Sequence, residues 1–293
     1  MSGKTVNSAI TILIIGNLMA VISDVIIKAA SDDIALFQFV AMRLLCTIVV
    51  LLPFWSMMDR NNFFAGWRIH LVRAHLGLAG ITCMVIALGA LPLAVANALF
   101  YLAPVLIMVF GVAFFGERLR GMSLFAVVSG FTGVLLILRP GEISWAGLAA
   151  IGLAVTIALS ALLVRKLPRQ QSVIHCLTIS SIYALPAALG LAVWEGEPLD
   201  LSLLGPAFGS SFFVLGYNAS LILAYRHVDA NQVTASEYTG LIWAFLIGWL
   251  WFSEVPDAWF YAGAAMIVVP LLLIALRTGA ARRRARRVAA PGT

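Results

Sequence analysis

Charged residues are scarce in this sequence, and their scarcity limits the class of protein. Only 11% of the 293 residues are Asp, Glu, Lys or Arg, whereas 62% are hydrophobic and the mean hydropathy is +1.02. A soluble globular domain carries about 25% charged residues. The composition therefore indicates an integral membrane protein and leaves no room for a separate soluble domain.

Cysteine is rare, and recognisable catalytic motifs are missing. Cys46, Cys83 and Cys176 each fall inside a hydrophobic run, so we expect neither a disulfide nor a metal site. The sequence contains no His-Glu metal spacing, no nucleophile elbow and no Gly-Lys phosphate loop. We therefore expect no enzyme, no ATP-driven pump and no cofactor.

Hydrophobic runs of about 20 residues fill most of the chain. A helix of that length crosses about 30 Å of hydrocarbon. The runs predict an all-α integral membrane protein with ten transmembrane helices, at 8–28, 34–57, 73–91, 93–115, 121–138, 146–165, 173–194, 206–225, 229–252 and 258–276.

The basic residues predict how these helices are oriented. With ten helices and a cytoplasmic N-terminus, sixteen of the 19 Lys and Arg residues fall on the cytoplasmic side. Cytoplasmic loops carry such an excess of positive charge. We expect a multi-pass protein of the cell inner (plasma) membrane, with both termini in the cytoplasm.

Five arginines lie in the last segment, 278–293, which we expect to be disordered. A basic cluster next to a membrane contacts anionic lipid headgroups. No other basic patch with interleaved aromatic residues occurs, so we expect no nucleic-acid partner.

The two halves of the chain repeat each other at an offset of 137 residues, which divides it into 1–140 and 141–277. Each half holds five predicted helices, so the second half must enter the membrane with the opposite orientation. Inverted repeats of this kind enclose a shared solute cavity near the middle of the membrane. The matched positions are Lys28 with Arg165, Asn97 with Thr234, Tyr101 with Tyr238, and Phe114–Glu117 with Trp251–Glu254.

The repeat also resembles a known family. It resembles the repeat of EamA-type members of the drug/metabolite transporter superfamily. The positions that carry the resemblance are 87–94 (ALGALPLA), Pro104, Gly116-Glu117-Arg118, Gly130 and Gly133 in the first half, and Ser236–Thr239 and Ser253–Pro256 in the second. Arg43 is also typical of that repeat. The resemblance implies a ten-helix carrier whose central cavity is lined mainly by the first, third, fourth, sixth, eighth and ninth helices. Members of the family move amino acids, nucleoside-like compounds, vitamins, cations or sugar derivatives.

Uncharged polar residues form one set of candidate solute-binding residues. Asn97 and Tyr101 are four residues apart and share a helix face, and their repeat counterparts Thr234 and Tyr238 do the same. The inverted repeat predicts that the two faces meet across the cavity. Tyr217 and Asn218 add a third polar wall, and Asn17 shares a polar stripe with Asp24. The alternative is hydrogen bonding between helices without any solute.

Ionisable residues within membrane helices cost about 2.5–3.5 kcal/mol each to insert, so those that are retained usually face a cavity or a partner. Arg43 and Glu237 lie at similar depth, as opposite poles for a zwitterion or as a structural ion pair. We favour the structural role for Arg43 and a cavity role, including proton coupling, for Glu237. Asp24 precedes Lys28 by four residues, which favours a surface ion pair between them over a place in the outer vestibule.

Two further groups are interpreted as structural. Glu117 and Glu254 lie at predicted helix ends, where helix dipoles stabilise carboxylates. Ala126, Gly130 and Gly133 permit close helix packing, either within the fold or in a homodimer.

The sequence thus predicts a secondary carrier of small polar or zwitterionic metabolites. Amino acids are the favoured cargo, and export is slightly favoured over import. The alternatives are an importer of a nucleoside-, flavin- or other cofactor-like solute, and, from another class, a gated channel.

Overall fold

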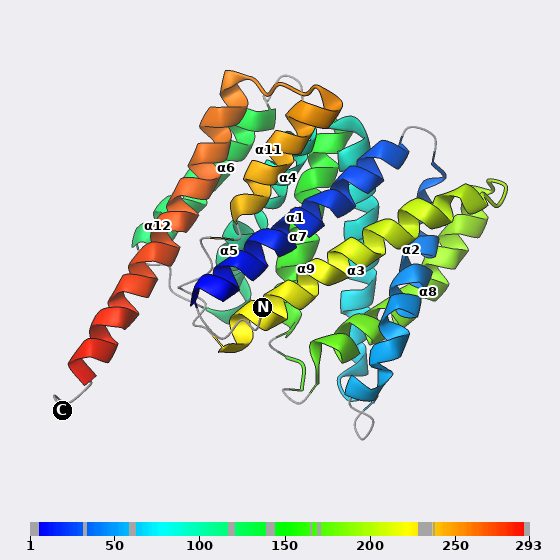
Figure 1. Ribbon diagram of the computed structural model, residues 1–293, viewed down its shortest axis with the longest axis horizontal. Helices are drawn as coiled ribbons and strands as arrows, with labels where there is room; N and C mark the ends of the chain where they lie inside the picture. Colours follow the sequence, from blue (N-terminus) through cyan, green and yellow to red (C-terminus); the bar gives the residue numbers. More distant parts are fainter. Residues whose placement is uncertain are drawn as a thin grey trace.

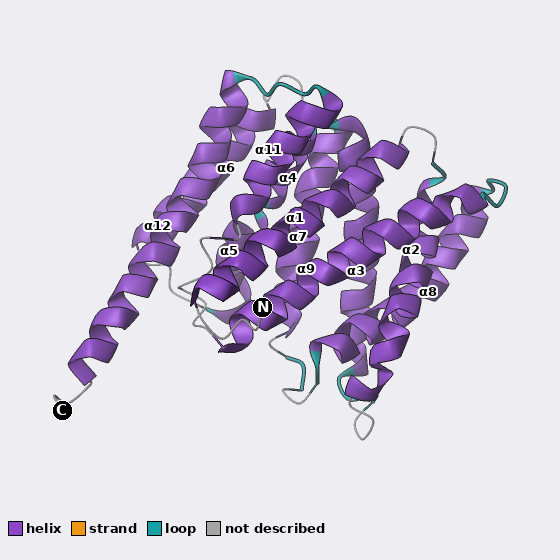
Figure 2. Cartoon of the chain, viewed as in Figure 1, coloured by secondary structure: helices purple, strands orange, loops and turns teal. Residues whose placement is uncertain are grey.

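The computed structural model describes residues 6–31, 34–58, 63–116, 121–138, 144–164, 166–168, 171–227, 236 and 238–289. Every regular element in these ranges is helical, joined by short loops (Figure 2). The helices are α1 (Val6–Ala30), α2 (Leu36–Leu51), η2 (Leu52–Met57), α3 (Trp67–Ala90), α4 (Leu93–Phe100), α5 (Ala103–Phe115), α6 (Gly121–Leu138), α7 (Trp145–Val164), α8 (Val173–Glu195), η3 (Leu201–Leu203), α9 (Leu204–His227), α11 (Thr239–Phe252) and α12 (Ala258–Ala289).

The predicted set of about ten membrane helices is confirmed. Eight segments are long and apolar enough to cross a membrane, and two shorter apolar helices, Thr239–Phe252 and Ala258–Ile274, accompany them. Three boundaries differ most from the sequence expectation. The first difference is that α3 begins at Trp67 rather than at 73, the second is that α12 continues through Ala289, and the third is that α11 begins at Thr239 rather than at 229.

The second difference corrects our expectation that the segment 278–293 is disordered, because its backbone is helical as far as Ala289. Hydropathy shows where a helix leaves the hydrocarbon, whereas hydrogen bonding decides where the helix ends. The segment is rich in alanine and arginine, which are both strong helix formers. Its helix therefore extends past the apolar run.

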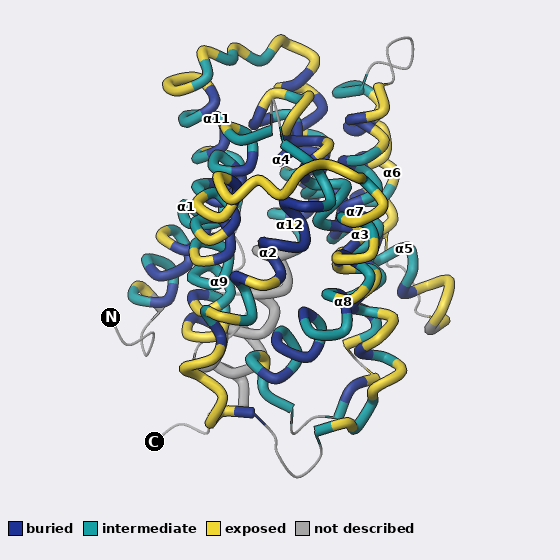
Figure 3. Tube along the Cα trace, turned by 90° about the vertical axis from the view of Figure 1, so that its right-hand side faces the viewer, coloured by how far each residue is buried: buried dark blue, intermediate teal, exposed yellow. Residues whose placement is uncertain are grey.

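Eight of the ten segments form a ring: seven of the long ones and the shorter α11. Neighbours around it are α1, α9, α2, α8, α3, α7, the broken pair α4/α5, and α11, which returns to α1. Helices α6 and α12 pack against each other beside this ring, and Figure 1 shows them at one edge of the molecule. Buried positions lie where the helices face one another, and exposed positions lie on their outer sides (Figure 3).

The helix order confirms the internal repeat. Helices α2, α3 and α6 begin at Leu36, Trp67 and Gly121, and their counterparts α8, α9 and α12 each begin 137 residues later. Contacts repeat in the same way, since α1 packs on α9 as α7 packs on α3. The ring therefore has two related halves.

One predicted helix, 93–115, is broken in the structure. Helix α4 ends at Phe100, Tyr101 and Leu102 form a turn, and α5 starts at Ala103. Pro104 lies in the first turn of α5 and has no N–H to bond the carbonyl of Phe100, so a continuous helix is interrupted here. The break lies near the middle of the membrane-spanning stretch.

Glycines bring α6 and α12 into backbone contact. A Cβ atom placed on Gly133 would lie 2.5 Å from the Gly263 carbonyl oxygen, and one on Gly263 would lie 2.5 Å from the Gly133 oxygen. A Cβ on Gly130 would lie 2.9 Å from a methyl group of Val105 on α5. These glycines therefore pack within the fold, and their faces are not available to a second copy of the chain.

We expect Gly133→Ala to destabilise the protein by about 1–3 kcal/mol, because the added methyl group meets backbone that cannot move aside easily. Thermal unfolding in detergent measures the effect. Gly77→Ala is the matched control, since a Cβ at Gly77 meets no atom within 4 Å. Equal melting temperatures for both variants would contradict this account of the α6–α12 contact.

Candidate solute-binding site

Two tyrosines from equivalent positions of the repeats meet where the broken pair α4/α5 lies against α11. Tyr101 closes α4 and Tyr238 precedes α11, with closely similar backbone angles (φ −66°, ψ −2° and φ −71°, ψ −6°). Their ring centroids are 5.5 Å apart and the rings are inclined by 35°. The structure thus brings together the two tyrosines that the repeat predicted to face each other.

Asn17 of α1, in the first repeat, hydrogen-bonds the second repeat on both sides of Tyr238. Its amide donates to the carbonyl oxygen of Ser236 (3.0 Å) and to Thr239 Oγ1 (3.3 Å). A Cβ placed on Gly240 would lie 2.6 Å from the Tyr101 hydroxyl oxygen and 3.6 Å from Asn17 Oδ1. Both polar groups therefore converge on a glycine in the first turn of α11.

Asp24 lies two turns further along α1 and is buried, with 6% of its surface exposed. Asp24 Oδ2 accepts a hydrogen bond from Asn97 Nδ2 at 3.1 Å, and the same amide donates to the Leu93 carbonyl. Lys28 makes its ion pair with Glu254 instead. The surface pair of Asp24 with Lys28 that we favoured from the sequence is therefore wrong, because α1 turns Asp24 towards α4.

Arg43 of α2 is also buried, with 5% of its surface exposed. Its Nε donates to Ser210 Oγ of α9 at 3.2 Å, and the Ser210 carbonyl accepts a hydrogen bond from Ser23. Ser23 is the chain neighbour of Asp24, so Asp24 lies beside this group of contacts. Glu237, the partner that we considered from the sequence, lies outside the described residues, so their pairing stays a prediction.

A charged cluster joins both repeats at the end of the ring that we predict to face outward. Lys28 Nζ lies 3.0 Å from Glu254 Oε1 and also donates to the carbonyls of Leu88 and Leu91 at the end of α3. Glu254 Oε2 accepts the N–H of Leu93 (2.7 Å), in the first turn of α4. Glu254 thus stabilises a helix N-terminus, as its position suggested, although the helix is α4.

The turn that presents Glu254 is repeated in the first half. Ser253 has a left-handed backbone (φ 56°, ψ 28°), as does its counterpart Gly116 (φ 64°, ψ 23°). Ser253 is the one non-glycine residue with positive φ among those described. Glu117, the counterpart of Glu254, lies outside the described residues.

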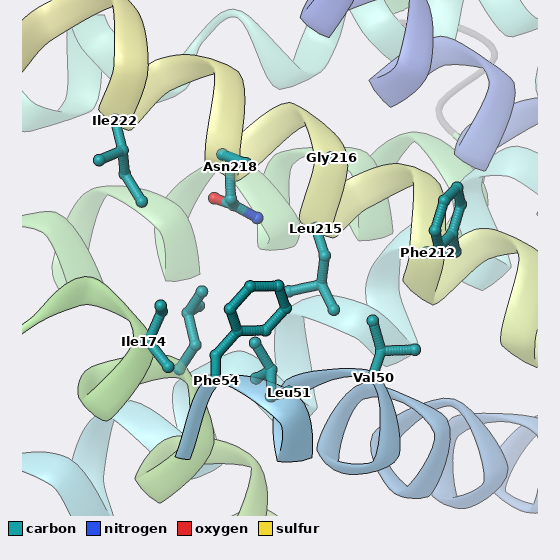
Figure 4. A pocket seen from close by; sticks show the side chains of 11 residues that line it. Val50, Leu51, Phe54, Ile174, Phe212, Leu215, Gly216, Asn218 and Ile222 are labelled. Carbon is teal, nitrogen blue, oxygen red and sulfur yellow. The ribbon is translucent and has the colours of Figure 1, made fainter. Parts of the chain in front are cut away.

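The remaining predicted residues are not brought to one place. Tyr217 faces α1, since a Cβ on Gly16 would lie 3.6 Å from its ring. Asn218, the next residue, lines a separate cavity of about 250 Å³ between α2, η2, α8 and α9 that is otherwise apolar (Figure 4). Tyr217 and Asn218 therefore do not form one polar wall. Thr234 lies outside the described residues.

Several polar contacts of the site were missed from the sequence. Ser23, Ser210, Ser236 and Thr239 each hydrogen-bond within or beside it, and Gly240 gives Tyr101 its room. A small hydroxyl inside an apolar helix is a weak signal, because it also bonds to its own helix. No group of three metal-ligating side chains was found in the described part of the chain.

The sequence of the whole chain decides the family. The model of the EamA-like transporter family matches it twice, over residues 7–139 and 144–276. This chain belongs to the EamA-like transporter family. As a member of this family it is a multi-pass membrane protein and a small-molecule transporter, and the two matches coincide with its two five-helix repeats.

Three relatives of this EamA-like chain show the range of the family. The riboflavin transporter of Rhizobium johnstonii is 33% identical over 71% of this chain and 70% of its own length. The pseudopaline exporter CntI of Pseudomonas aeruginosa is 28% identical (70% and 73% covered). The S-adenosylmethionine uptake transporter of Rickettsia conorii is 26% identical (86% and 87%).

A solved structure supports the fold. One protein crystal structure matches 94% of this EamA-like chain and 98% of its own, with a TM-score of 0.58 and 19% identity. At this identity the likeness shows the fold alone.

We expect Glu254→Gln to lower stability by about 1–3 kcal/mol, because Lys28 keeps its carbonyl contacts but loses its counter-charge. Thermal unfolding in detergent measures the loss. Glu197→Gln, in the exposed loop after α8, serves as the control. If both variants melt alike, the Lys28–Glu254 pair does not hold the outer end together.

Proposed function

We propose that this chain is a secondary carrier of small polar or zwitterionic metabolites, with amino acids as the favoured cargo. The two repeats would expose the central site alternately to the two sides of an inner membrane, with both termini in the cytoplasm. The solute gradient or a coupled ion supplies the energy. Export remains slightly favoured over import.

One observation carries the proposal: the repeats meet at Tyr101 and Tyr238, where helices start or end inside the membrane. The N-termini of α5 and α11 lie beside these tyrosines. Broken helices in transporters direct such positive dipole ends at anionic groups of the solute. An anionic or electron-rich part of the solute suits them.

The closed outer end supports alternating access. Lys28 and Glu254 join the repeats on the side that the positive-inside pattern assigns to the outside. Apolar side chains of α1, α2, α3, α8 and α11 pack together in the same half of the ring. We infer that the side of the ring held by Lys28 and Glu254 is shut in this conformation, as one of the two states of a carrier requires.

A second candidate is uptake of a flavin- or nucleoside-like solute. Riboflavin and S-adenosylmethionine appear in the names of two relatives. The Tyr101–Tyr238 pair offers aromatic faces on which a planar ring could stack. A gated channel is the candidate from another class, and it would show neither saturation nor counterflow.

Membrane lipids and a second copy of the chain, the partners that we expected from the sequence, are also part of this proposal. The basic segment 278–293 would contact anionic lipid headgroups beside the membrane. A homodimer stays a proposal too, formed through a face other than that of Gly130 and Gly133.

Counterflow in proteoliposomes tests the function. Vesicles loaded with unlabelled amino acids, riboflavin or S-adenosylmethionine should accumulate the matching labelled solute transiently. We expect Tyr101→Phe and Glu237→Gln to lower that rate about tenfold or more, because each removes a polar group that we assign to the site. The melting temperature should change little.

Tyr261→Phe, on α12 outside the ring, is the control and should transport at the rate of the unsubstituted protein. Normal counterflow by both site variants would show that the site is assigned wrongly. Flux that neither saturates nor shows counterflow would identify a channel.

A further inference from the structure

The two buried charges of the ring are held near each other but not in contact. Lys28–Glu254 is the one ion pair within 4.0 Å among the described residues, so Asp24 and Arg43 lie beyond that distance. They are nevertheless linked through Ser210, which hydrogen-bonds both Arg43 and Ser23, the chain neighbour of Asp24. A buried ion pair stabilises a protein when both partners touch and their remaining hydrogen bonds are satisfied. That condition is not met here.

Separate anchors keep the two groups apart. Asn97 of α4 binds Asp24, whereas Ser210 of α9 binds the Nε of Arg43. Ser23, next to Asp24 on α1, fixes the Ser210 backbone at 3.0 Å. Ser211 and Thr47 in turn donate to the Arg43 carbonyl, which fixes the backbone of α2. The positions of both charges are therefore set by three helices around them.

Each charged group keeps hydrogen-bonding capacity that the described residues do not use. A carboxylate accepts about four hydrogen bonds, and Asp24 receives one, from Asn97. A guanidinium has five N–H donors, and Arg43 uses one, at Nε, on Ser210. Both side chains are more than nine-tenths buried. The two side chains are thus shielded from most water, while their unpaired atoms are not fully enclosed.

We propose that Asp24 and Arg43 form a dipolar subsite that binds the charged head of an α-amino acid. Asp24, held by Asn97, accepts from the ammonium group, and the free N–H groups of Arg43 bind the carboxylate. A guanidinium suits a carboxylate because two parallel hydrogen bonds can form. This inference rests on the proposed carrier function and names the group that the carrier recognises.

The subsite differs from the zwitterion poles considered from the sequence. There Arg43 was combined with Glu237, whereas in the structure Ser23, the chain neighbour of Asp24, bonds the same Ser210 that accepts a hydrogen bond from Arg43. It also replaces a purely architectural role for Arg43. A solute that lacks one pole leaves a buried charge unsatisfied, which makes the subsite selective.

Binding of modified amino acids tests the subsite on the unsubstituted protein. The probes are alanine, leucine and phenylalanine, each with its methyl ester, which lacks the carboxylate, and its N-acetyl derivative, which lacks the ammonium group. Dissociation constants come from thermal shift and titration calorimetry in detergent. We expect at least one amino acid to bind, and both of its derivatives to bind about ten- to a hundredfold more weakly.

Two variants assign the poles. Arg43→Gln should abolish the preference for the amino acid over its methyl ester and keep the preference over the N-acetyl derivative. Asp24→Asn should do the reverse. Arg43→Lys and Asp24→Glu keep the charges and should keep both preferences, and Thr132→Val on α6 should change nothing. If the neutral variants do not fold, the derivative series and the charge-retaining variants still decide.

The outcomes of these experiments distinguish a failure of the subsite from a failure of the proposed carrier function. Counterflow of riboflavin or S-adenosylmethionine without binding of any amino acid would overturn the subsite and keep the carrier. Equal binding of an amino acid and either derivative would also overturn the subsite. Absence of counterflow for every solute would instead overturn the proposed function.

Discussion

A chain that crosses the membrane five times ends on the opposite side from where it began. This odd number of crossings constrains the rest of the structure. A second copy of the same five-helix unit must then lie upside down relative to the first. Equivalent residues of the two units can contact each other only near the middle of the membrane. Equivalent residues at the ends of the helices lie on opposite sides of the membrane instead. Tyr101 and Tyr238 are the central example, and Lys28 with Glu254 is the example at an end.

The central and outer contacts have different physical characters, which suits a carrier. At the centre, Asp24 accepts one hydrogen bond from Asn97 and Arg43 donates one to Ser210, so the capacity of both charged groups is only partly used. At the outer end, Lys28 has a carboxylate and two helix-end carbonyls as partners. A closed end needs strong, satisfied contacts, whereas a binding site needs contacts that a solute can replace.

Much of this architecture could be predicted from the sequence because hydropathy and repetition are signals of the chain itself. The ten helices, the 137-residue offset and the meeting of Tyr101 with Tyr238 follow from them. The partners of buried charges could not be predicted, since a shift of one position along a helix turns the side chain by about 100° towards a different neighbour. Asp24 was thus assigned to Lys28 by spacing, although it faces Asn97. Likewise, adjacent residues Tyr217 and Asn218 face different helices, and small residues such as Ser210 give no signal until the helices are packed.

The central claim is that two inverted repeats must separate at their outer end for a solute to pass. Cysteines at positions 28 and 254, introduced after Cys46, Cys83 and Cys176 are replaced, can be joined by a short reducible bis-thiol cross-linker. The account predicts that cross-linking stops counterflow of a carried solute and that reduction of the linker restores it. Counterflow at the full rate with the two positions joined would contradict it.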